Sequence, residues 1–219
     1  VLGRWQFREL DMFVDKRVLI PRPETEVLVE YVIEECRNKK VEFETQMDLN
    51  VADLGCGSGA IGLSIAAEVE GVSVWCSDIS EEAVSVTRAN LAGLGMAGQK
   101  VSISQGFWFD ALPEELLGKF DVIVSNPPYI GNEEELPLEV SEWEPSSSLI
   151  AGPLGTENLS FLLRKSIEWL ASDGTLFLEL SPMQADEMAQ EARYLGYREV
   201  KLRLDLAEKE RVLVAKKPL

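Results

Sequence analysis

The chain has 219 residues, enough for one sizeable hydrophobic core and too few for two ordinary domains of about 150 residues each. Its 46% hydrophobic and 27% charged residues are typical of a globular rather than a disordered protein. The 21 basic and 38 acidic side chains give a formal net charge of −17, which argues against binding to nucleic-acid phosphates or to an anionic membrane surface.

Histidine is absent, so the sequence excludes a Ser-His-Asp triad, a histidine-ligated metal and an imidazole proton shuttle. The cysteines Cys36, Cys56 and Cys76 are far apart, which indicates a reducing compartment and predicts no disulfide framework and no metal site. No apolar run approaches the ~20 residues of a membrane span, and the first ten residues do not resemble a signal peptide. We therefore expect a monomeric, cytoplasmic protein without membrane contact.

Strands and helices alternate along the chain. Residues 1–22 predict a short β element, and the Pro21-Arg22-Pro23 turn predicts a helix that begins at Glu24 and ends near Arg37. Further helices are expected over 60–69, 80–91, 155–170 and 183–195, and Ser80 is expected to cap the second of these. Apolar runs predict strands over 49–55, 72–78, 101–105, 120–126, 175–180, 198–203 and 211–216.

This alternation predicts an α/β fold, a doubly wound, Rossmann-like sheet of seven mostly parallel strands. No helix separates the last two strands, so they predict an antiparallel hairpin at one edge. Residues 127–153 form a longer connection than usual and are predicted to be a lid or substrate loop. We expect one catalytic domain over 23–219, with 1–22 as an N-terminal β element or linker.

A glycine-rich turn, Asp53-Leu-Gly55-Cys56-Gly57-Ser-Gly59-Ala-Ile-Gly62, follows the first strand of the sheet. In a doubly wound sheet, ligands bind outside the carboxyl ends of the strands, so this turn is the expected cofactor site. Glycines allow the backbone to approach a ligand closely, although a tight turn that only needs small residues is the simpler alternative.

Two cofactors are compatible with this turn. Residues 57–62 match the G-x-G-x-x-G dinucleotide fingerprint, and Asp78 ends the second strand where a carboxylate can accept hydrogen bonds from ribose hydroxyls. Asp53 separates the alternatives, because a carboxylate there would face the amino group of S-adenosylmethionine but would repel a pyrophosphate. The cationic sulfonium also suits an acidic chain. We therefore predict S-adenosylmethionine, with NAD as the alternative.

A second motif, Ser125-Asn126-Pro127-Pro128-Tyr129, stands at the end of the fourth strand. The prolines hold the loop rigid, so the Asn126 side chain and the Pro127 carbonyl can both accept hydrogen bonds from one planar NH₂ group. Tyr129 offers an aromatic face to the same group. The motif predicts a clamp that aims an amide or amino nitrogen at a methyl carbon without a strong base. Asn-Pro is also a common turn former, which is the simpler alternative.

The sequences LIPRPETE (19–26), DLGCGSGAIG (53–62) and SNPPYI (125–130) together resemble the release-factor glutamine methyltransferases, a family of class I methyltransferases. The resemblance extends from Val1 almost to the end of the chain. It implies N5-methylation of the glutamine in the Gly-Gly-Gln loop of class 1 peptide release factors, with S-adenosylmethionine as the donor. Release factors are thus the expected partners, with no direct nucleic-acid partner.

The resemblance assigns roles to residues of both motifs. Asn126, Pro127 and Tyr129 are the expected catalytic residues. Substrate contacts are expected from Asn126, Pro127, Pro128, Tyr129, Arg22 and Pro23. Cofactor contacts are expected from Asp53, Gly55, Cys56, Gly57, Gly59, Asp78, Ile79, Phe107, Trp108 and Asn126.

Three features depart from the family pattern. Phe107 stands where the family has an acidic residue that bonds the adenine, and Glu179-Leu180-Ser181 lacks the usual glycine after Glu179. The chain also begins where the family's N-terminal helical substrate-binding domain would end.

Two alternatives remain: an amino-methyltransferase for adenine or guanine in nucleic acid, and a non-catalytic S-adenosylmethionine-binding module.

Overall fold

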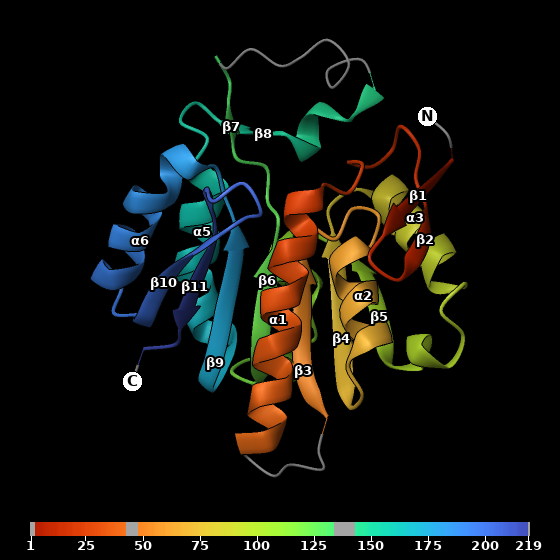
Figure 1. Ribbon diagram of the computed structural model, residues 1–219, viewed down its shortest axis with the longest axis horizontal. Helices are drawn as coiled ribbons and strands as arrows, with labels where there is room; N and C mark the ends of the chain where they lie inside the picture. Colours follow the sequence, from red (N-terminus) through yellow and green to blue (C-terminus); the bar gives the residue numbers. More distant parts are fainter. Residues whose placement is uncertain (1–2, 43–47, 134–142, 219) are drawn as a thin grey trace.

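The computed structural model describes residues 3–42, 48–133 and 143–218. Its centre is a seven-stranded sheet with the order β10-β11-β9-β6-β3-β4-β5 (Figure 1). Strand β11 runs antiparallel to its neighbours β9 and β10, whereas the other neighbouring strands of this sheet pair in parallel. The predicted doubly wound fold and its C-terminal hairpin are therefore confirmed. The strands are β3 (Leu49–Leu54), β4 (Val72–Asp78), β5 (Val101–Gln105), β6 (Phe120–Ser125), β9 (Leu170–Glu179), β10 (Arg198–Leu204) and β11 (Glu210–Lys216).

The central strands are buried on both faces. In β3, every residue except Asn50 is buried, and in β6 every residue except Asp121 is buried. Alternate residues of one strand point to opposite faces, so Val51 packs into the core on one side of the sheet and Ala52 into the core on the other. This double burial explains why the central strands are continuous apolar runs in the sequence.

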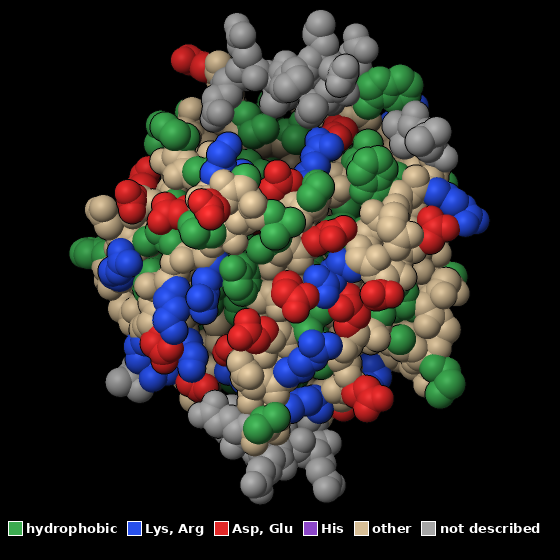
Figure 2. All heavy atoms as spheres, viewed as in Figure 1, with side chains coloured by type: hydrophobic (Ala, Val, Ile, Leu, Met, Phe, Trp, Pro, Cys, Tyr) green, Lys and Arg blue, Asp and Glu red, His purple; other side chains and the backbone are tan. Residues whose placement is uncertain are grey.

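Helices cover both faces of the sheet. Helices α1 (Pro23–Glu42), α2 (Ala60–Glu68) and α3 (Glu81–Leu91) contribute to the core on one face, and α5 (Glu157–Trp169) and α6 (Ala185–Tyr194) to the core on the other. Figure 1 shows α1 crossing the middle of the sheet. Lys, Arg, Asp and Glu side chains are interspersed over the face that α1 covers (Figure 2). This face therefore has mixed charge although the chain as a whole is strongly acidic.

Helix α1 is longer than the sequence predicted. It begins at Pro23, where the missing N–H costs nothing, and it carries Glu24 and Glu26 in its first turn. It continues to Glu42 instead of ending near Arg37. The polar residues after Arg37 resemble a helix end, but Lys39 is only 3% exposed and its ammonium contacts Asp173 of β9. A tertiary ion pair thus keeps this polar segment helical.

Strand β9 begins at Leu170, five residues before the predicted start. Leu170 pairs with Phe120, and the register shifts before Val122 pairs with Thr175. The small and polar residues 171–174 resemble a turn in sequence, but the sheet accommodates them as an irregularity within the strand.

Two smaller elements lie near the carboxyl ends of the parallel strands. Strands β1 (Arg4–Phe7) and β2 (Leu10–Phe13) form an antiparallel hairpin that buries Phe7 and Met12 in the core shared with α1. In the loop predicted over 127–153, strands β7 (Ile130–Gly131) and β8 (Ile150–Gly152) pair in parallel, and residues 134–142 lie outside the described part. Figure 1 shows β7 and β8 beyond the end of the sheet, on the side where β6 ends.

Within the residues that the structure describes, no helix combines the length and the apolar character that crossing a membrane requires.

Candidate active site

The glycine loop connects β3 to α2 through a backbone that only glycine adopts easily. Gly55, Gly57 and Gly59 have φ of 72°, 56° and 83°. A Cβ on Gly55 would stand 2.9 Å from the Trp108 ring, and a Cβ on Gly62 would stand 2.6 Å from Cys76 Sγ. The loop therefore turns sharply and also packs tightly against Trp108 and Cys76.

Backbone N–H groups of this loop already have acceptors within the protein. The N–H groups of Gly55 and Cys56 donate to the Ser77 carbonyl, and that of Gly59 donates to the Cys56 carbonyl. Two others donate to carboxylates: Gly57 N–H to Asp78 Oδ2 and Gly62 N–H to Asp53 Oδ2, each over 2.9 Å. A pyrophosphate would need these donors, so the loop is unsuited to a dinucleotide in spite of its G-x-G-x-x-G pattern.

Asp53 lies beneath the glycine loop and is fully buried, outside the residues that line the cavity. Burial raises its pKa to about 7; the Gly62 hydrogen bond opposes this shift and nearby Asp78 adds to it. Within the described structure, Asp53 Oδ1 is buried without a hydrogen-bond partner. An unsatisfied buried acceptor fits the ammonium group of a methionine moiety, and the contact predicted for Asp53 stays a prediction.

Asp78 ends β4 at the rim of the same cavity. Its Oδ1 accepts from Ser80 N–H and its Oδ2 from Gly57 N–H, each over 2.9 Å. Partial burial raises its pKa, while these backbone bonds favour the charged form. A carboxylate has about four acceptor positions, so these backbone donors leave acceptor capacity for a ribose hydroxyl.

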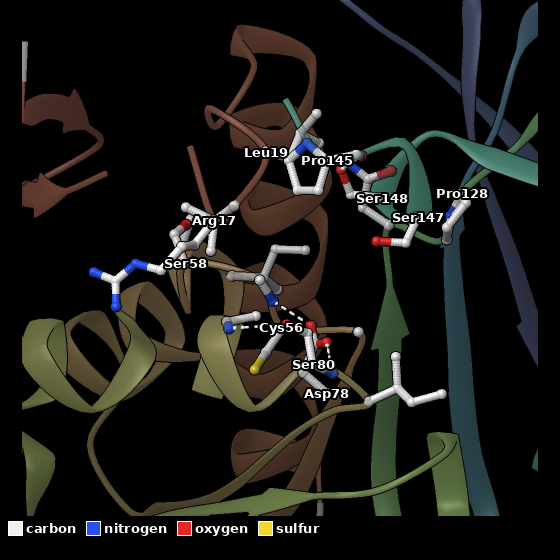
Figure 3. Close-up of a pocket in the computed structure, with 18 of the residues that line it drawn as sticks. Arg17, Leu19, Cys56, Ser58, Asp78, Ser80, Pro128, Pro145, Ser147 and Ser148 are labelled. Atoms are coloured by element: carbon white, nitrogen blue, oxygen red, sulfur yellow. Dashed lines mark hydrogen bonds between the residues drawn. The ribbon is translucent and has the colours of Figure 1, made fainter. Parts of the chain in front are cut away.

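The cavity encloses about 370 Å³ between the strand ends and the segment that carries β8. Figure 3 shows Leu19, Pro145 and Ser148 on the side opposite Cys56 and Asp78. Of the predicted site residues, its lining contains Gly55, Cys56, Gly57, Asp78, Ile79, Phe107, Trp108, Asn126 and Pro128. Those outside the lining are Asp53, Gly59, Pro127, Tyr129, Arg22 and Pro23. The specific contacts assigned to all of these residues stay predictions.

The aromatic wall of the cavity comes from the segment after β5. Phe107 is 46% exposed, and its ring packs against Phe161 of α5 at a centroid distance of 5.5 Å. Trp108 is buried with φ of 45°, an unusual backbone conformation for a large side chain. Its Nε1 is buried without a hydrogen-bond partner within the described structure. The apolar ring of Phe107 thus faces the cavity at the position where the resemblance predicted an adenine contact.

Side chains from other elements hold the Asn-Pro-Pro-Tyr loop. Asn158 Nδ2 donates to the Pro128 carbonyl over 3.2 Å, and Gln184 Nε2 donates to the Tyr129 carbonyl over 2.8 Å. Asn126 Nδ2 donates to Thr25 Oγ1 over 3.2 Å. Bound in this way, the Asn126 carboxamide has its nitrogen engaged and its oxygen on the opposite branch of the amide.

Arg22 connects the proline-rich turn to the segment before β8. Its Nη2 donates to both carboxylate oxygens of Glu144, over 2.7 and 2.8 Å. Burial raises the pKa of Glu144, and the charge of Arg22 opposes that shift. Two segments that border the cavity are therefore joined by an ion pair with one buried partner.

Several lining residues were not predicted as site residues. They include Arg17, Ser147, Ser148 and Asn158. Asn158 lies in the first turn of α5, far from both motifs in sequence, and no local pattern marks it. Thr25 belongs to the LIPRPETE segment that carries the family resemblance, without a contact assigned to it, yet it lines the cavity and bonds Asn126.

Known proteins resemble this chain in sequence. The methyltransferase small domain family matches residues 39–140. The release factor glutamine methyltransferase of Rhodopirellula baltica is 39% identical over 99% of this chain and 72% of its own length. The chain belongs to the release factor glutamine methyltransferase family. The Clostridium acetobutylicum member of this family is 38% identical over 98% of the chain and 73% of its own length.

The fold has relatives among solved structures. A methyltransferase from Pyrococcus furiosus superposes with a TM-score of 0.66 and 19% sequence identity, covering 97% of this chain and 91% of its own. At this identity the likeness concerns the fold alone, which is the one expected for the family.

Proposed function

We propose that this chain transfers a methyl group from S-adenosylmethionine to the side-chain amide nitrogen of the glutamine in the Gly-Gly-Gln loop of peptide chain release factors. The observation that carries the proposal is the Asn126 carboxamide, which lines the cavity beside the glycine loop with its nitrogen already bound to Thr25. An amide NH₂ needs acceptors, and this orientation presents an oxygen. Membership of the release factor glutamine methyltransferase family supports the same substrate.

S-adenosylmethionine supplies an electrophilic methyl carbon on a cationic sulfur. The residues in and beneath the cavity fit it: Asp78 in the lining offers acceptors for ribose hydroxyls, and the unsatisfied Oδ1 of Asp53, buried under the glycine loop outside the lining, suits a cationic amine. Phe107 offers an exposed ring to a planar base. The glycine loop lets its backbone lie against the ligand because no side chains intervene.

Asn126 and the Pro127 carbonyl perform the orienting step. Their two oxygens accept from the two N–H groups of the substrate amide and fix the plane of that amide. With its plane fixed, the amide would present its nitrogen to the methyl donor in one held orientation, and such positioning accelerates bimolecular displacement. As positive charge develops on the nitrogen, the same oxygens stabilise its N–H groups.

Tyr129 shapes this slot as a neutral phenol. Burial, and to a lesser extent the charge of Glu179, raise its pKa to about 12, although the charge of Arg211 opposes the shift. A phenol with this pKa does not act as a base at neutral pH. The proton therefore leaves after the N–C bond forms, when the nitrogen is strongly acidic.

A labelled-methyl assay tests the function. The chain is offered an intact class 1 release factor, the same factor with Gln→Ala in its Gly-Gly-Gln loop, and separately DNA and RNA. Label in the intact factor that the Gln→Ala variant lacks is the expected result. Label that persists in that variant, or that enters only nucleic acid, would contradict the substrate.

The same proposal extends to the state, location and extent of the enzyme. The chain acts as a monomer in the cytoplasm, where release factors work, and does not bind nucleic acid directly. The catalytic unit spans 23–219.

A further inference from the structure

A buried chain of hydrogen bonds runs from the end of β9 to the Asn-Pro-Pro-Tyr loop. The Thr25 hydroxyl, in the first turn of α1, donates to Glu179 Oε2 over 2.8 Å. Asn126 Nδ2 donates in turn to Thr25 Oγ1 over 3.2 Å. Glu179 is 1% exposed and Thr25 4% exposed, so bulk water does not reach the two inner groups.

The direction of this chain follows from the groups that form it. An ionised carboxylate only accepts, so Thr25 must direct its single O–H toward Glu179. The Thr25 oxygen is then left as an acceptor, and it selects the NH₂ branch of the Asn126 carboxamide. The oxygen branch of Asn126 is consequently left for the substrate. If the direction of these hydrogen bonds were reversed, the Asn126 NH₂ would face the substrate NH₂, and two donor groups cannot form a hydrogen bond with each other.

We propose that Glu179 and Thr25 are positioning residues for methyl transfer: the Glu179 carboxylate fixes the direction of the Thr25 hydroxyl, and that hydroxyl holds Asn126 with its oxygen toward the substrate nitrogen. This inference rests on the proposed function, because it assumes that the acceptor is an amide NH₂. Neither residue touches the reacting atoms; both act through Asn126.

The protonation state of Glu179 decides whether the direction is fixed. Burial raises the pKa of Glu179 to about 7; the Thr25 hydrogen bond and the charges of Arg211 on β11 and Arg22 oppose this shift, while Glu24 of α1 adds to it. Above this pKa the carboxylate permits one direction. Below it, a protonated Glu179 can donate to Thr25 and allows the reverse direction as well. Activity is therefore expected to fall as the pH decreases through about 7.

The molecule provides a matched control. Thr175 of β9 donates to Glu35 Oε1 of α1 over 2.7 Å, so the same helix and strand are joined by a second Thr–Glu bond. Ten residues of helix separate Glu35 from Thr25, which is about 15 Å along the axis. Thr175 is 1% exposed and lies outside the cavity lining. Because Thr175 does not contact Asn126, a substitution of Thr175 measures the structural cost of losing such a bond alone.

The experiment measures kcat, KM for the release factor, S-adenosylmethionine affinity by calorimetry, melting temperature and the pH profile of kcat. Thr25→Val is expected to lower kcat about 10-fold, with KM and cofactor affinity within about twofold. Thr25→Ser, which keeps the hydroxyl, is expected to retain kcat. It should also retain the acidic limb of the pH profile, which is the fall in kcat as the pH decreases through about 7. Thr175→Val is expected to lower the melting temperature but to leave kcat and the pH profile unchanged.

Glu179→Gln gives the sharpest outcome. A glutamine can either accept or donate at Thr25, so this variant should resemble the protonated enzyme at every pH: kcat reduced several-fold and the acidic limb absent. A Glu179→Gln variant that keeps the acidic limb would overturn the inference, as would Thr25→Val and Thr175→Val with equal kcat. Failure of the wild-type chain to label the glutamine would instead contradict the proposed function.

Discussion

The two loops that border the cavity are held in different ways. The glycine loop holds itself: its N–H groups bond to Ser77, Cys56, Asp53 and Asp78, which lie within the loop or at the end of a neighbouring strand. The Asn-Pro-Pro-Tyr loop depends on side chains from α1, α5 and the turn before α6. A cofactor site can thus be encoded in one continuous segment, whereas the substrate clamp needs the assembled fold.

Asn126→Ala should show most clearly that the two loops have different roles. It removes the acceptor for the substrate amide and should lower kcat about 10²- to 10³-fold, the range found when one charge-stabilising group is removed. S-adenosylmethionine affinity, measured by calorimetry, should change little because the glycine loop is untouched. Full activity in this variant would contradict the clamp.

Gly62→Ala should break the glycine loop by sterics. The added Cβ would stand 2.6 Å from Cys76 Sγ and 3.0 Å from Asp53 Oδ2, inside a packed core. Overpacking of this kind costs about 1–3 kcal/mol, which denaturant titration measures as a loss in the free energy of unfolding.

The double variant Gly62→Ala with Cys76→Ala is the control for this clash. It removes the nearest contact and should cost less than the sum of the two single changes. Additive losses would mean that the loop moves away from Cys76.

Asp78→Asn should weaken cofactor binding without affecting the clamp. The amide keeps one acceptor oxygen where the carboxylate has two, so the ribose and the Gly57 N–H compete for it. Loss of one charge-assisted hydrogen bond predicts about 10-fold weaker S-adenosylmethionine binding by calorimetry. Asp110→Asn changes an exposed carboxylate outside the cavity lining and should leave that affinity unchanged.

Asn158→Ala should have the smallest effect. It frees the Pro128 carbonyl, but Gln184 and Thr25 still hold the flanking residues. The loss of one neutral hydrogen bond predicts a fall in kcat of about fivefold, with the melting temperature nearly unchanged. A loss as large as that of Asn126→Ala would mean that Asn158 contacts the substrate directly.

The sequence by itself determined the seven strands, their alternation with helices and the C-terminal hairpin, because buried strands and capped helices leave periodic local patterns. It also placed the glycine loop and the Asn-Pro-Pro-Tyr loop at strand ends, because the residues of each are consecutive. The family followed from these two loops together with the LIPRPETE segment at 19–26.

The tertiary structure alone decided what holds Asn126 and which residues outside the two motifs border the cavity. Thr25 bonds Asn126 across 101 residues, Arg22 bonds Glu144 across 122, and Thr25 bonds Glu179 across 154. Such pairs leave no local pattern, since each partner is an ordinary polar residue of its own helix, strand or loop. The length of α1 and the position of Asp53 beneath its loop were hidden for the same reason: each depends on a contact that forms only when the layers pack.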